Sequence, residues 1–257
     1  MIGAACLLAL ALGCRDHPQT RLSEALAAAQ LEEPPDGLVR ALEVLTRGTR
    51  YDDRWVLNPA SRQWDGVAVF LLREDTDWQA LGRRYRPLAT VQDNCRAFLD
   101  EQAVLCDAGF PGSFLHRHLG TTDQLPSFLW WLVGHELGHL AEGTEGNHSL
   151  RSEGARPSIR TLESQRREYG ADCWMIRQML TQGTPQERLA LEVLALDLVN
   201  SRFRETETSL PAGVGIIFDY NRAEPYDFVG IESHPDLILR SLRVMHVSAT
   251  ETDQPAL

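Results

Sequence analysis

The stretch WLVGHELGHLAEG, from Trp131 to Gly143, places two histidines four residues apart in an apolar segment that ends in polar residues. On an α-helix, His135 and His139 are separated by about 400° of rotation and about 6 Å of rise, so both imidazole rings leave the same face. This placement suits two zinc–nitrogen bonds of about 2 Å. Glu136 follows the first histidine, where its carboxylate can serve as a general base beside the metal. The stretch therefore predicts a helix that carries a metal site.

Two features of this helix favour a metal site over a chance match, because H-E-x-x-H also occurs in many unrelated proteins. The motif follows SFLWWLVG (127–134), and two histidines and a glutamate are unfavourable inside so apolar a helix unless they have partners. Gly138 also lowers helix propensity by about 1 kcal/mol relative to alanine. A neighbouring backbone that passes close to Gly138 would explain this glycine.

A catalytic zinc site needs a third protein ligand and keeps one position open. Glu142 shares the helical face but lies about 10 Å along the axis from His135, so it does not easily join the same ion. His148, in the polar segment that follows, is a minor candidate. His116 and His118 are expected at the surface rather than at a metal.

Glu168 is the stronger candidate for the third ligand. It lies in RREYGADCW (166–174), on the next expected helix. Asp172 is four residues further on and shares its helical face, while Gly170 and Ala171 allow two helices to approach closely. One carboxylate for the metal and a second to orient a ligand histidine is the set that a zinc site requires.

The segments HELGH (135–139) and EYGAD (168–172) together resemble the gluzincin metallopeptidases of the HtpX and CAAX-prenyl-protease type, whose signature is H-E-x-x-H followed by E-x-x-A-D. SHPDLILRSLRV (233–244) is similar to a Ser/Thr-x-His-Pro segment of that family. The resemblance covers roughly residues 103–244 in motif order, with few specific positions. HtpX-type members carry transmembrane helices, and no such segment is evident here, so the chain resembles the soluble or lipid-anchored branch.

The resemblance implies a zinc-dependent metalloendopeptidase with Zn²⁺ as cofactor and a peptide or protein as substrate. The implied roles are metal binding by His135, His139 and Glu168, activation of water by Glu136, and support of the site by Asp172. His234 is a candidate for stabilising the developing oxyanion, and the alternative is a histidine at a helix start beside Pro235. An extended peptide is expected to pair with an edge strand near Val104–Cys106.

The expected fold class is α+β, a mainly helical zincin-like domain over residues 20–248 with a small antiparallel sheet. Apolar runs beginning at Gly66 and Ala103, with the segment around Cys95, predict the strands. Helical patterns cover residues 23–30, 37–46, 124–142, 158–180 and 184–205, and a shorter helix is expected from Ser233. Thr184 and Glu187 have the spacing of a capping box.

The amino-terminal MIGAACLLALALGC (1–14) has the profile of a secretory signal peptide, and it is too short to span a bilayer. The last four residues resemble a bacterial lipobox, which makes Cys14 a candidate for lipidation, although Ala11 and Leu12 depart from the usual pattern. The expectation is an exported protein, periplasmic or membrane-anchored, of a bacterium. The alternative is a buried amino-terminal helix.

Cys95 and Cys106 bracket a segment that reads as strand, turn and strand. Paired strands would bring the two thiols close enough to bridge in an oxidising compartment. The alternative is two ordinary half-buried cysteines. Cys173 is expected inside a helix as a small apolar residue.

Composition excludes some function classes. The chain has 257 residues, 43% of them hydrophobic, which is enough for one domain with its own core. Its net charge is -11 and it contains no lysine, so it is a poor nucleic-acid binder. Two alternatives to the enzyme stay open: a non-catalytic zinc-containing binding or regulatory protein, and an exported helical lipoprotein whose motif is accidental. The oligomeric state is not predicted.

Overall fold

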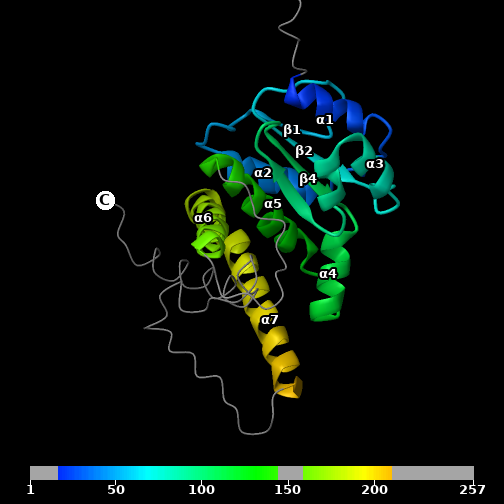
Figure 1. The fold of residues 1–257 in the computed structure, drawn as a ribbon. Coiled ribbons are helices and arrows are strands. Elements are labelled where there is room, and N and C mark those ends of the chain that lie inside the picture. Colours follow the sequence, from blue (N-terminus) through cyan, green and yellow to red (C-terminus); the bar gives the residue numbers. More distant parts are fainter. Residues whose placement is uncertain (1–16, 144–158, 210–257) are drawn as a thin grey trace, which may run out of the picture.

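The computed structural model describes residues 17–143 and 159–209 (Figure 1). The expected signal peptide with Cys14, the minor metal candidate His148, and the helix from Ser233 that contains His234 lie outside these residues. The described chain is a mixture of α-helices and β-strands, as expected for an α+β protein. Its elements are α1 (Pro18–Leu26), α2 (Asp36–Thr46), β1 (Trp55–Leu57), β2 (Val67–Leu72), α3 (Trp78–Arg84), the 3-10 helix η1 (Arg86–Thr90), β3 (Cys95–Phe98), β4 (Ala103–Asp107), α4 (Phe110–Leu119), α5 (Leu125–Glu142), α6 (Ile159–Gln182) and α7 (Pro185–Ser209).

The four strands form one mixed sheet in the order β1-β2-β4-β3. Strands β1, β2 and β4 run parallel, and only β3 is antiparallel to its neighbour β4. The expected antiparallel sheet is therefore wrong outside the β3–β4 pair. The chain passes through α3, η1 and β3 between β2 and β4, which lets the two central strands run in the same direction. Both are buried along their whole length, as is typical of parallel strands covered on both faces.

The position of β4 also corrects the expected substrate edge. Val104–Cys106 belongs to a strand that pairs on both sides, with β2 and with β3. The outer strands of the sheet are β1 and β3. The expected pairing of a peptide with Val104–Cys106 is therefore wrong, because β4 already has a strand on each side.

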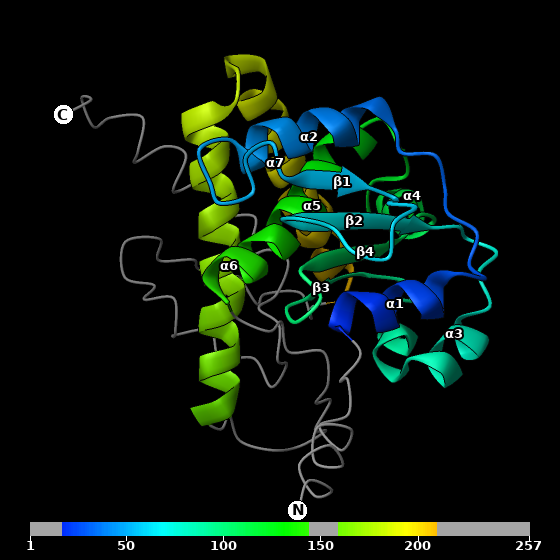
Figure 2. The same cartoon turned by 90° about the horizontal axis from the view of Figure 1, so that it is seen from above.

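Helices cover both faces of the sheet, so the described chain has two apolar cores (Figures 1 and 2). Val67, Val69 and Leu71 of β2 face one core, which contains residues of α2, α5, α6 and α7. Ala68 and Phe70 face the other core, which contains residues of α1 and α3. This two-sided burial explains why the β2 segment is a continuous apolar run rather than an alternating one.

Helix α5 is the central helix of the larger core. Most of its residues from Phe128 to Leu140 are buried, on every side of the helix. It packs against α2, α6 and α7 and beneath β3 of the sheet. Within the described ranges, no helix is both long enough and apolar enough to cross a membrane.

Local sequence signals explain several element boundaries. The expected capping box is present: Thr184 N donates to Glu187 Oε2 at 2.7 Å, and Glu187 N donates to Thr184 Oγ1 at 3.3 Å. Asp77 caps α3 by accepting a hydrogen bond of 2.8 Å from the backbone N–H of Ala80, although the sequence pattern did not predict this short helix. Helix α1 begins at Pro18 and ends at Leu26, so the expected helix over residues 23–30 was placed too late.

Candidate metal centre

Helices α5 and α6 meet almost backbone to backbone at Gly138. A Cβ atom on this residue would lie 2.6 Å from the carbonyl oxygen of Ala171 and 2.7 Å from its Cα. These distances are shorter than any ordinary carbon contact, so only glycine fits here without a shift of α6. The expectation that Gly138 faces a neighbouring backbone is confirmed. This close approach brings the side chains of α5 and α6 within reach of one another.

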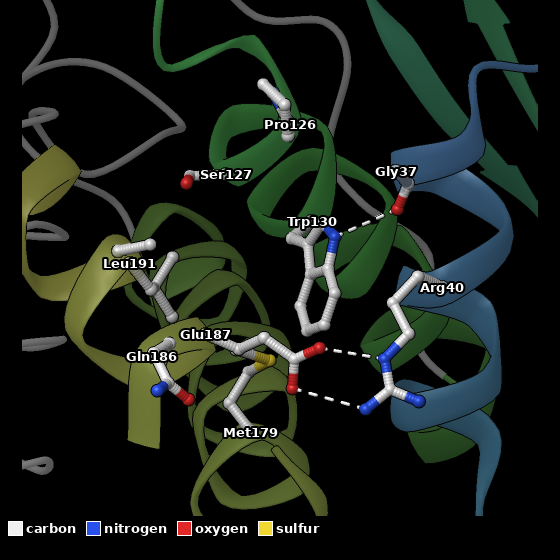
Figure 3. A pocket seen from close by; sticks show the side chains of 10 residues that line it. Gly37, Arg40, Pro126, Ser127, Trp130, Met179, Gln186, Glu187 and Leu191 are labelled. Atoms are coloured by element: carbon white, nitrogen blue, oxygen red, sulfur yellow. Dashed lines mark hydrogen bonds and ion pairs between the residues drawn. The ribbon is translucent and has the colours of Figure 1, made fainter. Parts of the chain in front are cut away.

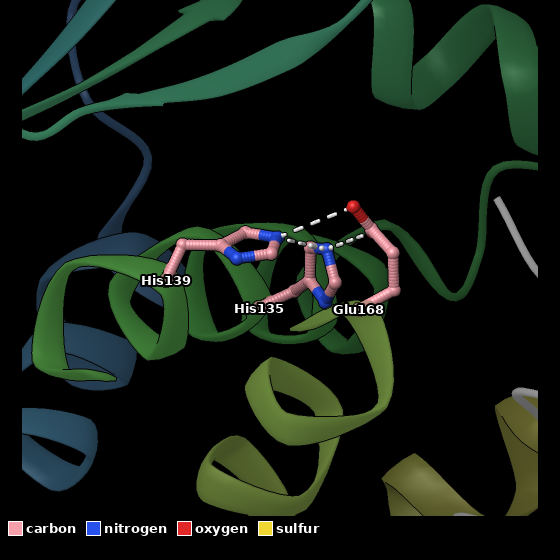
Figure 4. Close-up of side chains that lie close together, drawn as sticks. All are labelled: His135, His139 and Glu168. Atoms are coloured by element: carbon pink, nitrogen blue, oxygen red, sulfur yellow. Dashed lines mark hydrogen bonds and ion pairs between the residues drawn. The ribbon is translucent and has the colours of Figure 1, made fainter. Parts of the chain in front are cut away.

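Three side chains from these two helices point toward a common position (Figure 4). The Nε2 atoms of His135 and His139 are 3.1 Å apart, and His135 Nε2 lies 3.1 Å from Glu168 Oε2. His139 Nε2 lies 3.7 Å from Glu168 Oε1. Neighbouring donors around a tetrahedral zinc ion with bonds of about 2 Å are separated by about 3.3 Å. The three residues are therefore spaced as metal ligands are.

The chemistry of these donors fits a cation. His135 Nδ1 lies 2.8 Å from Asp172 Oδ1. A carboxylate here accepts a hydrogen bond from the N–H at Nδ1, which leaves a lone pair on His135 Nε2. That lone pair faces a carboxylate oxygen of Glu168 and the ring nitrogen of His139, so three groups that can donate electron pairs to a metal lie together. A divalent cation among them would bind all three.

The site is enclosed by protein. His139 and Glu168 are each 1% exposed and Asp172 is 0% exposed. Two carboxylates at this depth are unfavourable unless positive charge or hydrogen bonds compensate them. The indole Nε1 of Trp131, one helical turn before His135, lies 3.4 Å from Asp172 Oδ1 and contributes one such contact. Sequence reasoning missed Trp131, although its i, i+4 spacing to His135 could have indicated it.

Glu136 lies beside the three candidate ligands and has a different neighbour. Its side chain is 6% exposed, and its Oε2 accepts a hydrogen bond of 2.7 Å from the backbone N–H of Ala97 on β3. The sequence could not reveal this partner, because a backbone amide leaves no signal in residue type. The structure thus directs the Glu136 side chain from α5 toward β3 at the edge of the sheet.

The remaining predicted residues are placed as follows. Cys95 and Cys106 stand opposite each other on β3 and β4 and form a disulfide bond, with 4.0 Å between their Cα atoms. Cys173 is half-buried on α6. His116 is exposed and His118 half-buried on α4, and neither belongs to the candidate ligand group.

A separate hollow of about 290 Å³ lies between α2, α5, α6 and α7 (Figure 3). Trp130, Met179 and Leu191 form much of its lining, and an ion pair of 2.7 Å joins Arg40 and Glu187 beside them. Its lining includes none of the three candidate metal ligands. The hollow is therefore distinct from the candidate metal centre.

Among the described residues, His135, His139 and Glu168 are the group that could hold a metal ion, with ligand atoms all within 4.8 Å of one another. Asp172 contacts the first of them, and Glu136 directly follows that histidine on α5. No protein-family model, curated protein or solved structure matches this chain.

Proposed function

We propose that this chain is a zinc-dependent metalloendopeptidase that hydrolyses peptide bonds. The observation that carries the proposal is the meeting of His135, His139 and Glu168 at distances of 3.1 to 3.7 Å, with a glutamate adjacent to the first histidine. Three protein ligands leave the fourth coordination position of a zinc ion open for water or substrate. Catalytic zinc sites have this arrangement, whereas structural sites fill all four positions with protein ligands.

Each residue has a role that follows from its place. His135, His139 and Glu168 would hold the metal, and Asp172 would keep the His135 ring in the tautomer that binds it. Zinc in such a site lowers the pKa of water toward about 7 and polarises a carbonyl group. Glu136 would take the proton of the attacking water and pass it to the leaving amine. His234 remains a proposed oxyanion-stabilising residue.

The test combines metal content with proteolysis. Purified protein is expected to contain about one zinc per chain by elemental analysis, and to cleave casein in a reaction that a chelator stops and zinc restores. Iron in place of zinc would contradict the proposal, because two histidines and one carboxylate also form iron(II) sites.

Glu136→Gln separates the enzyme from a non-catalytic zinc protein of similar shape. The substitution keeps the size of the side chain but removes the base, so zinc content is expected to stay and casein cleavage to be lost. Residual cleavage equal to that of the wild-type protein would show that Glu136 is not the general base. Zinc without any cleavage in the wild-type protein would favour the binding or regulatory protein.

We also propose that the protein is exported, with residues 1–14 as a lipoprotein-type signal sequence in which Cys14 is the residue that is lipidated and kept. The disulfide bond between Cys95 and Cys106 supports this proposal, since such bonds persist in oxidising compartments. The mass of the mature protein from a bacterial envelope fraction tests it. An unmodified chain that begins at Met1 in the cytoplasmic fraction would contradict it.

A further inference from the structure

The pairing of β3 with β4 determines which backbone groups of β3 point away from β4, toward the side on which the described residues add no further strand. Asp107 N donates to Asn94 O at 3.0 Å, so these opposite residues form a hydrogen-bonded pair. In an antiparallel ladder such pairs alternate with pairs that exchange no hydrogen bonds. The opposite pairs Cys95–Cys106 and Ala97–Val104 are then of the second kind. The N–H groups of Cys95 and Ala97 therefore point away from β4.

Both of these outward amides already have an acceptor within the chain. Cys95 N donates to the side-chain oxygen of Asn94 at 2.9 Å. Ala97 N donates to Glu136 Oε2 at 2.7 Å. A peptide that adds to an exposed strand needs such amides as donors for its own carbonyl groups. At Ala97 it therefore competes with the same carboxylate that would act as general base.

We propose that the Ala97 amide holds the Glu136 carboxylate in the substrate-free protein and releases it when an extended peptide pairs with β3. This inference rests on the proposed peptidase function. The exchange breaks one hydrogen bond, Ala97 N–H to Glu136 Oε2, and forms another, Ala97 N–H to a peptide carbonyl oxygen. No proton is transferred in this step, and no covalent bond forms or breaks.

The exchange makes Ala97 a positioning residue that acts through Glu136. While the carboxylate accepts a strong hydrogen bond, the electron pair on Oε2 is engaged and its side chain is fixed toward β3. A short substrate that does not reach Ala97 leaves this bond intact. An extended substrate removes it, so kcat is expected to rise with peptide length.

A binding experiment tests the competition without catalysis. Wild-type protein is first incubated with a mixture of peptides from a tryptic digest, and the bond that it cleaves is identified. A peptide of about ten residues that spans this bond is then made with a fluorophore. The affinity of this peptide is then compared between zinc-loaded Glu136→Ala and Glu136→Gln. Both lack the base, but only the glutamine keeps an acceptor for the Ala97 amide. Glu136→Ala is expected to bind about threefold to tenfold more tightly, as one freed hydrogen bond allows.

Each outcome decides a question. Tighter binding by Glu136→Ala supports the exchange. Equal or weaker binding, in a protein whose wild-type form contains zinc and cleaves peptides, overturns the exchange and leaves the proposed function standing. Wild-type protein that contains no zinc and cleaves no peptide in the mixture overturns both.

A second pair of variants tests the donor. Ala97→Pro removes the N–H, and proline is tolerated at an edge position whose amide does not pair with the neighbouring strand. Ala97→Ser keeps the N–H and is the control. With a blocked dipeptide from the same cleavage site, Ala97→Pro is expected to raise kcat about threefold, while KM for the ten-residue peptide rises. A kcat lowered for both substrates with KM unchanged would show instead that the amide orients Glu136 for catalysis, which overturns the release.

Discussion

Glu168 provides a carboxylate oxygen to each of the two histidines, with Oε2 near His135 and Oε1 near His139. It is 1% exposed, so a water molecule cannot easily take its place as a ligand. Among the residues of α6, Glu168 is therefore the one on which the proposed metal site depends most. A substitution here is expected to change metal binding directly, without unfolding of the helix.

Glu168→Ala is expected to weaken zinc binding by about two orders of magnitude or more, beyond the tenfold to hundredfold effect of groups that only orient a ligand. Elemental analysis after dialysis against a weak chelator measures the change. The matched control is Glu142→Ala, because Glu142 is exposed at the end of α5 and outside the ligand group. Unchanged zinc content in Glu168→Ala would refute the ligand assignment.

At the scale of elements, α5 contacts both α6 and β3 through the side chains of the candidate site. His135 and His139 face α6, while Glu136 reaches β3. The close packing of α5 on α6 at Gly138 is what brings the carboxylates of α6 to the histidines. The spacing between these two helices therefore sets the geometry of the site.

Gly138→Ala is expected to destabilise the protein by about 1 to 3 kcal/mol, because the added methyl group would lie 2.6 Å from the Ala171 carbonyl oxygen and force α6 away. Zinc affinity should fall with it. Urea unfolding and zinc titration measure both effects. Gly112→Ala is the control, since Gly112 lies in α4 with nothing within 4 Å of a Cβ atom, and a stability gain of up to about 1 kcal/mol is expected. Equal stability of the two variants would contradict the close contact.

The start of α7 gives a prediction on pH. Burial would raise the pKa of Glu187, but hydrogen bonds with Arg40 and Thr184 outweigh this effect and lower the pKa below the ordinary value of 4.5. At pH values between the folded and the unfolded pKa, the unfolded chain binds more protons, so stability rises with pH. The stabilisation by Glu187 is thus full above about pH 4.5 and is lost as the pH falls through the folded pKa.

Glu187→Gln removes this titration. The difference in unfolding free energy between wild type and Glu187→Gln should shrink as the pH is lowered from 6 to 3, as followed by urea unfolding at each pH. Glu43→Gln is a matched control, because Glu43 contacts Arg40 at 3.3 Å from a more exposed position. A difference that does not vary with pH would show that the Arg40 contact contributes nothing through the charge of Glu187.

At the scale of the whole molecule, a metal held between α5 and α6 links two segments that are distant in sequence. Zinc binds the folded chain in preference to the unfolded one, so saturating zinc is expected to raise Tm by about 5 to 10 °C over the chelated protein. Glu168→Ala should show no such rise. The same Tm for wild-type protein with zinc and with chelator, measured by calorimetry, would contradict a metal site between these helices.

Much of the architecture could be predicted from local patterns. The long helices α5, α6 and α7, the strands β2 and β4, and the capping box at Thr184 follow from periodicity and end signals, which are properties of neighbouring residues. The grouping of His135, His139 and Glu168 was also foreseen, from the i, i+4 spacing of the two histidines and from the resemblance of the Glu168–Asp172 segment to the gluzincin signature. Their metal and their reaction stay predictions.

What failed depends on contacts between segments far apart in the chain. The parallel direction of β2 and β4 is set by the path of the chain between them, and an apolar run reads the same in either direction. For the same reason the edge was assigned to Val104–Cys106 rather than to β3. The bond from the Ala97 amide to Glu136 was also unforeseen, since every residue except proline offers such a donor.

An amide on the margin of a sheet normally exchanges its hydrogen with solvent deuterium within a short time, because water reaches it. The Ala97 amide should behave differently, since its acceptor, Glu136, is only 6% exposed. Slow deuterium uptake at Ala97 is therefore expected in the resting protein, and fast uptake in Glu136→Ala. Amide exchange followed by NMR would thus report, in the absence of any substrate, whether the carboxylate rests against the strand, and rapid uptake at Ala97 in both proteins would show that it does not.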